Sequence, residues 1–519
     1  MLPVFTAEEM RRVDQRAIRE LDIPGATLME NAGRGAAACI QAALADLGLA
    51  RRGVRVAVVC GKGGNGGDGF VVARWLKRAG HRVEVFLLAA PDELRGDPAL
   101  KLREMERRGL RARVVEDPAV LARALPAAQL VVDAMLGTGA RGEPSALIAG
   151  AIEHVNASGR PVVALDVPSG LSADGAPPEG PVVRATLTPT FAGLKRGLIV
   201  GPGVTLAGRV VVVDIGVPRA AIERGVATFV LEPADVARHF PPRPRDNHKG
   251  SYGHLLVIAG SVGKTGAAAL AARAAMRAGA GLVTVATAAS AQPVVAALLL
   301  EAMTEPVAET AVRTIALKAR DALHDLAARR DAVALGPGLG LDEDTQALAR
   351  ALVFDFEQPM VVDADALTAL TGHLDRLRGA RAARCLTPHP GEMARMLGVT
   401  IADVQRDRIA TARRFATTWQ TPVVLKGATS VIGLPDGTVL LNPTGNPGMA
   451  SGGTGDVLSG VLGAFLARGL EPAAALGAGV YLHGLAGDVA AERLGQESLV
   501  AGDVIEALPE AFRRVGAGR

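Results

Sequence analysis

Residues 54–80, VRVAVVCGKGGNGGDGFVVARWLKRAG, contain the pattern that decides the fold class. An apolar segment of strand length, 54–60, leads at once into the glycine-rich sequence GKGGNGGDG at 61–69, and a helix-like sequence follows. Short strands that are apolar on both faces and alternate with helices are typical of a parallel sheet covered by helices. The segment therefore predicts an α/β fold.

The same alternation recurs along the chain in two series. Apolar runs of the first series lie at 54–60, 83–88, 130–135, 161–167 and 209–217. Those of the second lie at 254–261, 281–287, 331–338, 359–366, 384–390 and 421–427.

A connection separates the two series, because the segment 230–253 carries four prolines and mixed charges. A chain of 519 residues is also too long for one ordinary core. We place a boundary near residue 225, which gives a domain at 1–225 and a domain at 226–519.

Composition excludes several classes of protein. The net charge is only +4, and the chain has neither a dense basic run nor basic residues interleaved with aromatics, so nucleic acid is not an expected partner. The alanine-rich stretch 267–290 is interrupted by Arg273 and Arg277, so no membrane span is expected. The three cysteines are far apart, which favours free thiols in a reducing compartment.

The N-terminal sequence predicts a capped helix, with Thr6 as N-cap and Glu9 three residues later. It lacks the apolar run of a signal peptide. A cytoplasmic enzyme is the expectation.

The glycine-rich sequence at 61–69 permits two interpretations. Glycines let a ligand approach the backbone, and amides at a helix N-terminus bind anions. GKGGNG also fits the GxGxxG pattern, but no acidic residue ends the next strand in a ribose-binding position. The alternative is a tight turn in which Asp68 is a helix N-cap.

Polar residues also follow other strands of the first series. Asp133 ends the strand 130–135 and Asp166 ends the strand 161–167. Ligands of open α/β sheets bind at such carboxyl ends. Asn65, Asp133 and Ser169 offer hard oxygen ligands there, which suit an alkali or alkaline-earth cation.

These segments carry a family resemblance. Asp14, LMENAGRGAA at 28–37, GGNGGDG at 63–69, DAMLGTG at 133–139 and LDVPSGL at 165–171 resemble the YjeF N-terminal domain, the NAD(P)H-hydrate epimerase family. The resemblance covers roughly the first 215 residues, and it implies a Rossmann-like three-layer domain.

The resemblance also implies the site residues. K⁺ would be held by Asn65, Asp133 and Ser169, and Asp166 would serve the chemistry. The hydrated dinucleotide would contact Asp166 and two loops, made of Gly64, Asn65, Gly66, Gly67, Asp68, Gly137, Thr138, Gly139, Ala140, Arg141, Gly142 and Glu143. The chain departs from the family at Gly64, where asparagine is usual, and at 185–191, where an aspartate commonly follows the alanine.

The second half carries further glycine-rich sequences. GKT at 263–265 is not a P-loop, because Ile258 stands where the first glycine should be. GGTG at 452–455 precedes Asp456 and a helix-like sequence. Its amides could cradle a transferring phosphoryl group, and Asp456 could accept a proton from an attacking hydroxyl. The alternative is a helix N-cap.

A second resemblance follows from ordered motifs. HKGSYGHLLVIAGS, GPGLG, DADAL, TPHPGE, LKG and GGTGD resemble the ribokinase-like fold, and more narrowly the YjeF C-terminal domain, the ADP/ATP-dependent NAD(P)H-hydrate dehydratase family, over about residues 245–515. The resemblance implies substrate contacts at Ala268, Gly338, His389 and Asp456. It implies nucleotide contacts at Lys426, Gly427, Ala428, Thr429, Ser430 and Gly455, together with Mg²⁺ and a homo-oligomer.

Together the two resemblances predict a bifunctional enzyme. It would epimerise the R and S hydrates of NADH and NADPH, and dehydrate the S form with ADP or ATP. One alternative is a ribokinase-like small-molecule kinase with an accessory ligand-binding domain. Another is a first half that binds a ligand or protein without catalysis.

Overall fold

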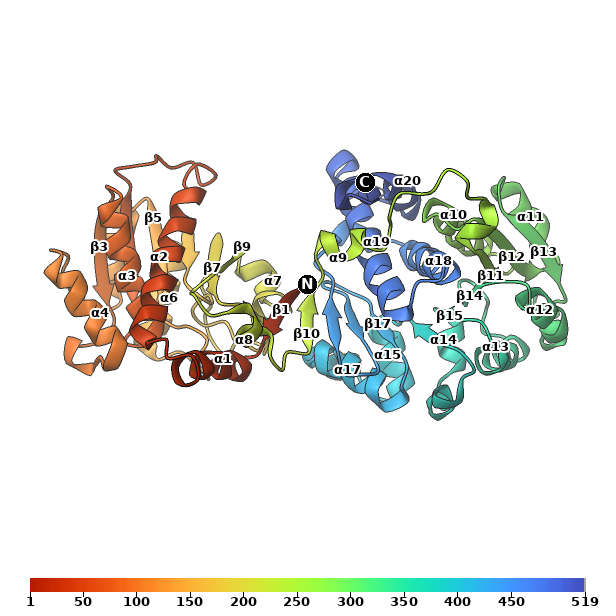
Figure 1. The fold of residues 1–519 in the computed structure, drawn as a ribbon, viewed down its shortest axis with the longest axis horizontal. Coiled ribbons are helices and arrows are strands. Elements are labelled where there is room, and N and C mark those ends of the chain that lie inside the picture. Colours follow the sequence, from red (N-terminus) through yellow and green to blue (C-terminus); the bar gives the residue numbers. More distant parts are fainter. Residues whose placement is uncertain (518–519) are drawn as a thin grey trace. The chain divides into compact units, whose positions relative to one another are not determined.

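The computed structural model describes residues 1–517 and forms two compact units. The first unit is Leu2–Val226, and the second comprises Met1 and the residues from Ala227 onward (Figure 1). The division after Val226 lies next to the boundary that the sequence places near residue 225. Both units have largely parallel sheets between helices, so the predicted α/β fold class is confirmed.

The first unit is built on a seven-stranded sheet in the order β4-β3-β2-β5-β6-β7-β9, and all its strand pairs are parallel. The strands are β2 (Arg55–Cys60), β3 (Arg82–Leu87), β4 (Ala112–Val114), β5 (Leu130–Ala134), β6 (Val162–Ala164), β7 (Leu187–Phe191) and β9 (Arg209–Val213). A short pair, β1 (Leu2–Phe5) with β8 (Leu194–Lys195), is also parallel.

Helices cover both faces of this sheet, because its central strands are apolar on both sides. One face carries α2 (Gly25–Ala43), α3 (Gly64–Arg78) and α4 (Gly96–Arg107), and the other carries α5 (Ala119–Ala124) and α6 (Ala146–Ala157). The helix α1 (Ala7–Arg19) precedes α2 and packs its buried Met10 and Val13 into the first of these cores.

The chain reverses its direction of travel across the sheet between β2 and β5. These strands are neighbours, but β3 and β4 extend the sheet on one side, whereas β6, β7 and β9 extend it on the other. A reversal of this kind opens a crevice outside the carboxyl ends of the two strands, where open α/β sheets bind ligands. The glycine-rich segment after β2 and the loop after β5 border that crevice.

The second unit repeats this arrangement on a longer sheet, in the order β13-β12-β11-β14-β15-β16-β17-β18-β19-β10. The strands are β10 (Thr228–Val230), β11 (His254–Ile258), β12 (Leu282–Ala288), β13 (Met303–Val307), β14 (Ala332–Leu335), β15 (Met360–Val362), β16 (Arg384–Leu386), β17 (Val423–Leu425), β18 (Val431–Gly433) and β19 (Val439–Leu441). Only β18 runs antiparallel to its neighbours. The reversal lies between β11 and β14.

Four helices share the large core of the second unit: α10 (Thr265–Arg277), α18 (Thr454–Ala467), α19 (Pro472–Leu494) and α20 (Ala501–Val515). On the other side of the sheet lie α13 (Glu343–Asp355), α15 (Pro390–Leu397) and α17 (Arg408–Trp419) (Figure 1). The helices α10 and α18 approach closely because Gly460 has no side chain: a Cβ there would lie 2.0 Å from the carbonyl oxygen of Ala271.

Two helix starts differ from the alternatives left open by the sequence. Helix α3 begins at Gly64 with Gly63 as its N-cap, since the Gly67 amide already donates to the Gly63 carbonyl. Most of the expected loop is therefore helical, and the N-cap interpretation of Asp68 is wrong. Gly453 is the N-cap of α18, so the N-cap interpretation of Asp456 is wrong as well.

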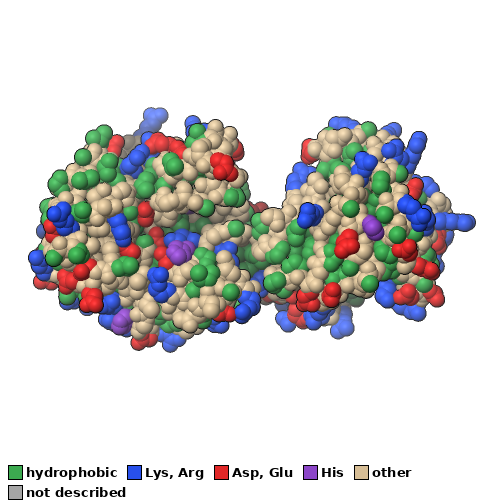
Figure 2. Space-filling model, turned by 180° about the vertical axis from the view of Figure 1, so that it is seen from behind, with side chains coloured by type: hydrophobic (Ala, Val, Ile, Leu, Met, Phe, Trp, Pro, Cys, Tyr) green, Lys and Arg blue, Asp and Glu red, His purple; other side chains and the backbone are tan. Residues whose placement is uncertain are grey.

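The predicted cap of α1 is confirmed, with Thr6 and Glu9 forming a reciprocal capping box. No helix within residues 1–517 is long and apolar enough to cross a membrane. Figure 2 shows acidic and basic side chains interspersed over the visible face of both units.

Each unit contains one of the two tryptophans. Trp75 of α3 donates from its indole nitrogen to Glu30 at 3.0 Å. Trp419, the last residue of α17, packs on Phe415 with ring centroids 4.5 Å apart.

Candidate active sites

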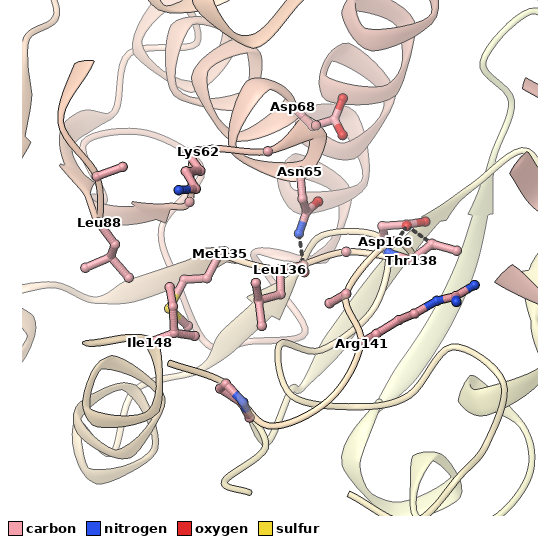
Figure 3. A pocket seen from close by; sticks show the side chains of 18 of the residues that line it. Lys62, Asn65, Asp68, Leu88, Met135, Leu136, Thr138, Arg141, Ile148 and Asp166 are labelled. Carbon is pink, nitrogen blue, oxygen red and sulfur yellow. Dashed lines mark hydrogen bonds between the residues drawn. The ribbon is translucent and has the colours of Figure 1, made fainter. Parts of the chain in front are cut away.

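The first unit contains a cavity of about 1280 Å³ at the reversal between β2 and β5. Helix α1 forms one wall, and the segments after β2 and β5 form another. Of the residues expected to bind substrate, the cavity is lined by Gly64, Asn65, Asp68, Asp166 and the loop residues from Gly137 to Glu143 (Figure 3). Gly66 and Gly67 do not line it. A Cβ at Gly66 would lie 1.9 Å from the Gly61 carbonyl oxygen, so that glycine allows α3 to pack on its preceding loop.

Asp166 occupies a strained position at the floor of this cavity. Its backbone φ is +66°, which is uncommon for a residue other than glycine and concentrates at functional sites. Its Oδ2 accepts hydrogen bonds from the backbone amide and the hydroxyl of Thr138 (Figure 3). Its Oδ1 lies 2.7 Å from the Nζ of Lys195.

Lys195 is the buried counter-ion of Asp166, with only 1% of its side chain exposed. Its ammonium also donates to the Phe191 carbonyl at 2.6 Å. Burial opposes ionisation of Asp166, but the Lys195 charge and the Thr138 hydrogen bonds outweigh it, so the pKa of Asp166 lies below its usual value. Asp166 is therefore a fixed negative charge in the neutral pH range.

Two other carboxyl groups in the cavity have the opposite tendency. Burial raises the pKa of Asp14 to about 6, although Lys195 partly counteracts the effect. Burial, followed by repulsion from Asp166 and Asp14, raises the pKa of Asp68 well above its usual value. Among the aspartates that line this cavity, Asp166 thus has a lowered pKa, whereas Asp14 and Asp68 have raised pKa values.

Asp133 and Ser169 lie beneath the cavity and are fully buried. Asp133 Oδ1 accepts from the Ser169 hydroxyl at 2.6 Å, and its Oδ2 accepts from the Ser169 amide at 2.8 Å. Burial raises the pKa of Asp133 to about 6 despite these bonds. Asn65 donates from Nδ2 to the Leu136 carbonyl at 2.7 Å, whereas its buried Oδ1 has no hydrogen-bond partner.

The second unit assembles a buried charge cluster at the start of α18. The carboxylate of Asp363, which follows β15, is 2.7 Å from Lys426 Nζ and accepts a 2.6 Å hydrogen bond from the Ser459 hydroxyl. Burial opposes ionisation of Asp363, but Lys426 and Ser459 outweigh it and lower its pKa. Lys426 therefore directs its ammonium into this cluster. A Cβ at Gly455 would lie 3.5 Å from that ammonium.

Asp456 is the third residue of α18 and lies beside this cluster. Burial, together with the Asp363 charge, raises the pKa of Asp456 to about 6. Glu392 Oε2 lies 3.8 Å from Lys426 Nζ, and burial raises the pKa of Glu392 to about 7. His389 is the N-cap of α15: its Nδ1 accepts from the amide of Gly391 at 3.0 Å, and more than half of its side chain is exposed.

The segment after β17, residues 426–430, is held by one buried guanidinium. Arg408 of α17 donates to the carbonyls of Leu425, Lys426 and Ala428. Gly427 has φ +144° and Thr429 has φ +55°, so the segment is sharply bent. The Lys426 amide donates to the Pro388 carbonyl at 2.9 Å, so the start of the segment is fixed by hydrogen bonds from both its carbonyl and its amide.

The remaining expected substrate residues lie at the reversal between β11 and β14. Gly338 follows β14 with φ +63°, and a Cβ there would lie 3.0 Å from the Ala267 side chain. Ala268 is fully buried in α10, and its Cβ packs against Gly260 instead of facing an open surface.

Sequence reasoning missed several of these functional groups. Lys195 is a lone lysine on a two-residue strand, and no local pattern indicates its pairing with Asp166. Arg408 lies in a helix that contains five other arginines or threonines, and no sequence motif distinguishes it. Asp363 is the first residue of the DADAL motif, and its place directly after a strand was the signal that could have identified it.

Comparison with known proteins identifies the family of both units. The model of the YjeF-related protein N-terminus matches residues 25–197, and that of NAD(P)H-hydrate dehydratase matches residues 255–510. A bifunctional NAD(P)H-hydrate repair enzyme from Moorella thermoacetica is 44% identical, over 99% of this chain and 97% of its own. This chain belongs to the family of bifunctional NAD(P)H-hydrate repair enzymes. The resemblance drawn from the motifs is confirmed.

Other members of the repair-enzyme family and solved structures are similar as well. The Escherichia coli repair enzyme is 37% identical, over 97% of this chain and 93% of its own. The ADP/ATP-dependent NAD(P)H-hydrate dehydratase from Bacillus subtilis, co-crystallised with ATP and Mg²⁺, is 33% identical over 55% of this chain and 97% of its own, with a TM-score of 0.48. A ribokinase-like superfamily protein from Enterococcus faecalis is 26% identical over 56% of this chain and 98% of its own, also with a TM-score of 0.48.

Proposed function

We propose that this chain repairs hydrated NADH and NADPH in two steps. The first unit interconverts the R and S epimers of the C6 hydrate, and the second dehydrates the S epimer with consumption of ADP or ATP. The observation that carries this proposal is the similarity to bifunctional NAD(P)H-hydrate repair enzymes along 99% of the chain. Two separate sets of charged groups, one in each unit at the carboxyl ends of sheet strands, support it.

In the first unit, epimerisation requires the C6–oxygen bond to break and re-form. The lone pair of the ring nitrogen expels the oxygen as water once a proton is supplied, which leaves a cationic iminium ring. The ionised Asp166 would stabilise this positive charge. Water then adds to either face of the ring and returns the proton. The residues 64–68 and 137–143 would hold the dinucleotide.

K⁺ fits the group beneath this cavity. Asn65 Oδ1 is a buried acceptor without a partner, and Asp133 is a buried carboxylate that lies close to no basic side chain among the described residues. K⁺ prefers oxygen donors of this kind, so Asn65, Asp133 and Ser169 would hold it. The ion would supply a fixed positive charge under the loops.

In the second unit, Asp456 would act as general base. It takes the proton of the C6 hydroxyl, whose oxygen attacks the terminal phosphorus of the nucleotide and releases AMP or ADP. The phosphate ester then leaves as C5 loses a proton, and the C5–C6 double bond of NAD(P)H is restored. Lys426 and the amides of the GGTG segment would stabilise the phosphoryl group during its transfer.

Mg²⁺ usually keeps several waters and binds through phosphates and one or two carboxylates. Glu392, beside Lys426, is the carboxylate that would hold it, and the ion would neutralise phosphate charge. The nucleotide would bind along the segment 426–430. The enzyme would act in the cytoplasm. It would also form a homo-oligomer, and analytical sedimentation would measure the mass of that assembly.

The experiment is to incubate the purified chain with a mixture of R and S NADH hydrates, Mg²⁺, and either ADP or ATP. Absorbance of restored NADH reports dehydration, and chromatography resolves the epimers. Complete conversion of both epimers is expected only with a nucleotide. Consumption of neither epimer would refute the proposal, and a stable phosphorylated product without NADH would favour the small-molecule kinase.

A further inference from the structure

The proton that expels the C6 oxygen needs a donor, and Asp166 is poorly suited to supply it. Both of its oxygens are engaged, one by Lys195 and the other by two groups of Thr138. A carboxylate held ionised by a buried lysine stabilises positive charge but does not carry a proton through the reaction. The donor must be another group in the same cavity.

Helix α1 presents such a group from the facing wall. Its cavity-lining residues recur at helical spacing, and they are Ala7, Met10, Arg11, Asp14 and Ile18. Asp14 is the only carboxyl group in this stripe, and the structure gives it no ion-pair partner within hydrogen-bonding distance among the described residues. Its surroundings are Lys195 and Asp166 across the cavity, with Asp68 of α3 nearby.

We propose that Asp14 is the general acid of the first unit: its carboxyl proton passes to the departing C6 oxygen, while the ion pair of Asp166 and Lys195 stays fixed and stabilises the iminium ring. This inference rests on the proposed epimerase function. The C6–oxygen bond breaks as the ring nitrogen forms a double bond to C6, the oxygen leaves as water, and Asp14 becomes a carboxylate. On return, water adds to C6 and its proton restores the Asp14 carboxyl group.

The other charged groups around α1 leave Asp14 available for this role. Arg11 of the same helix is paired with Glu8. Asp174 accepts a hydrogen bond from the Ala7 amide at the helix start. The neighbouring helix α8 (Arg219–Glu223) carries Arg219 and Glu223, which pair with each other at 2.6 Å. The burial that raises the pKa of Asp14 to about 6 leaves a useful fraction of acid near neutral pH.

Asp14→Asn and Asp14→Glu in the full chain test the proposal, with Glu8→Gln as control, because Glu8 is an exposed carboxylate of α1 that does not line the cavity. Epimerisation of the R hydrate of NADH is followed by chromatography without nucleotide, so that dehydration is silent. For the wild type, kcat should fall about tenfold per pH unit above about 6, because the acid form of Asp14 is lost.

Asp14→Asn should lower kcat at pH 6 by about a hundredfold or more, with KM nearly unchanged, and abolish this pH dependence. Asp14→Glu should recover at least a tenth of the rate together with the pH dependence, and Glu8→Gln should match the wild type. Asn with wild-type rate and pH profile would overturn the proposal. If Asp14→Asn also impairs folding or KM, the Asp14→Glu variant decides. A fall in kcat for Asp14→Glu as large as that for Asp14→Asn would overturn the proposal. A wild type that interconverts no epimers would instead refute the epimerase function itself.

Discussion

At the scale of single residues, the two units use aspartates in contrasting electrostatic settings. Asp166 touches the buried Lys195 and Asp363 touches the partly buried Lys426, and both pKa values are lowered. Asp14 and Asp456 lack such a contact, and burial raises both pKa values to about 6. A fixed anion beside a carboxyl group that exchanges its proton is an arrangement that separates charge stabilisation from proton transfer.

We predict that Asp166→Asn lowers the rate of epimerisation by about two to four orders of magnitude and leaves dehydration of the S hydrate unchanged. Asparagine keeps the shape but removes the charge that opposes Lys195. The measurement is epimer composition against time. Asp22→Asn is the matched control, since Asp22 is exposed and also has a positive φ, of 53°. Equal loss of both activities in a folded variant would contradict two separable sites.

We predict that dehydration requires the ionised form of Asp456. Because its pKa is raised to about 6, the rate should be constant above about pH 7 and fall about tenfold per unit below pH 6. Asp456→Asn should lower the rate by about two to four orders of magnitude while nucleotide affinity changes little. Steady-state kinetics with ATP and the S hydrate measure both, and Asp325→Asn on the exposed face of α12 (Arg320–Ala327) is the control. Full turnover at saturating nucleotide would exclude a base role.

The residues at strand ends were predictable, but their charge partners were not. Asp133, Asp166 and Asp456 stand next to glycine-rich segments, so chemistry and position are both visible in the sequence. The partners come from distant parts of the chain: Lys195 is 29 positions from Asp166, and Lys426 is 63 positions from Asp363. Only the folded sheet brings these groups together, and local sequence patterns do not predict contacts between residues so far apart.

At the scale of elements, the apolar runs located most central strands, because strands buried on both faces have a strong composition signal. Several other strands were missed. β7 was not recognised because Pro189 interrupts it, and β18 and β19 have three residues each. The beginning of α3 was placed too late, because four glycines within its first six residues argue locally against a helix, whereas tertiary packing favours it.

We predict that Arg408→Met raises KM for the nucleotide about ten- to a hundredfold and leaves epimerisation unchanged. Its guanidinium fixes three carbonyls of the segment after β17, and hydrogen bonds to a charged group contribute about 1.5–3 kcal/mol. Arg414→Met, at an exposed position of the same helix, is the control. Nucleotide titration of the dehydration rate is the measurement. A normal KM in the Met variant would show that the segment holds its shape without Arg408.

At the scale of the whole molecule, each candidate site is built entirely from residues of its own unit. The first contains residues up to Lys195, and the second contains residues from Gly338 to Ser459. Both lie at the carboxyl ends of parallel strands, so the same rule of sheet topology places two unrelated chemistries.

We predict that two single-site variants complement each other in solution. Asp166→Asn alone should leave the R hydrate unconsumed, and Asp456→Asn alone should restore almost no NADH. An equimolar mixture should convert both epimers completely, because the S hydrate released by one chain can be dehydrated by another. NADH absorbance after long incubation is the measurement, with each variant alone at doubled concentration as control. Persistence of the R hydrate in the mixture would mean that the substrate must pass within one chain.

The placement of one tryptophan in each unit has a practical consequence for fluorescence. Trp75 and Trp419 are the only indoles of the chain, so intrinsic emission is the sum of one reporter per unit. Replacing Trp419 by phenylalanine leaves a signal from the first unit alone, and replacing Trp75 leaves a signal from the second. The two single-tryptophan chains would then give a separate urea-unfolding midpoint for each unit of the intact protein.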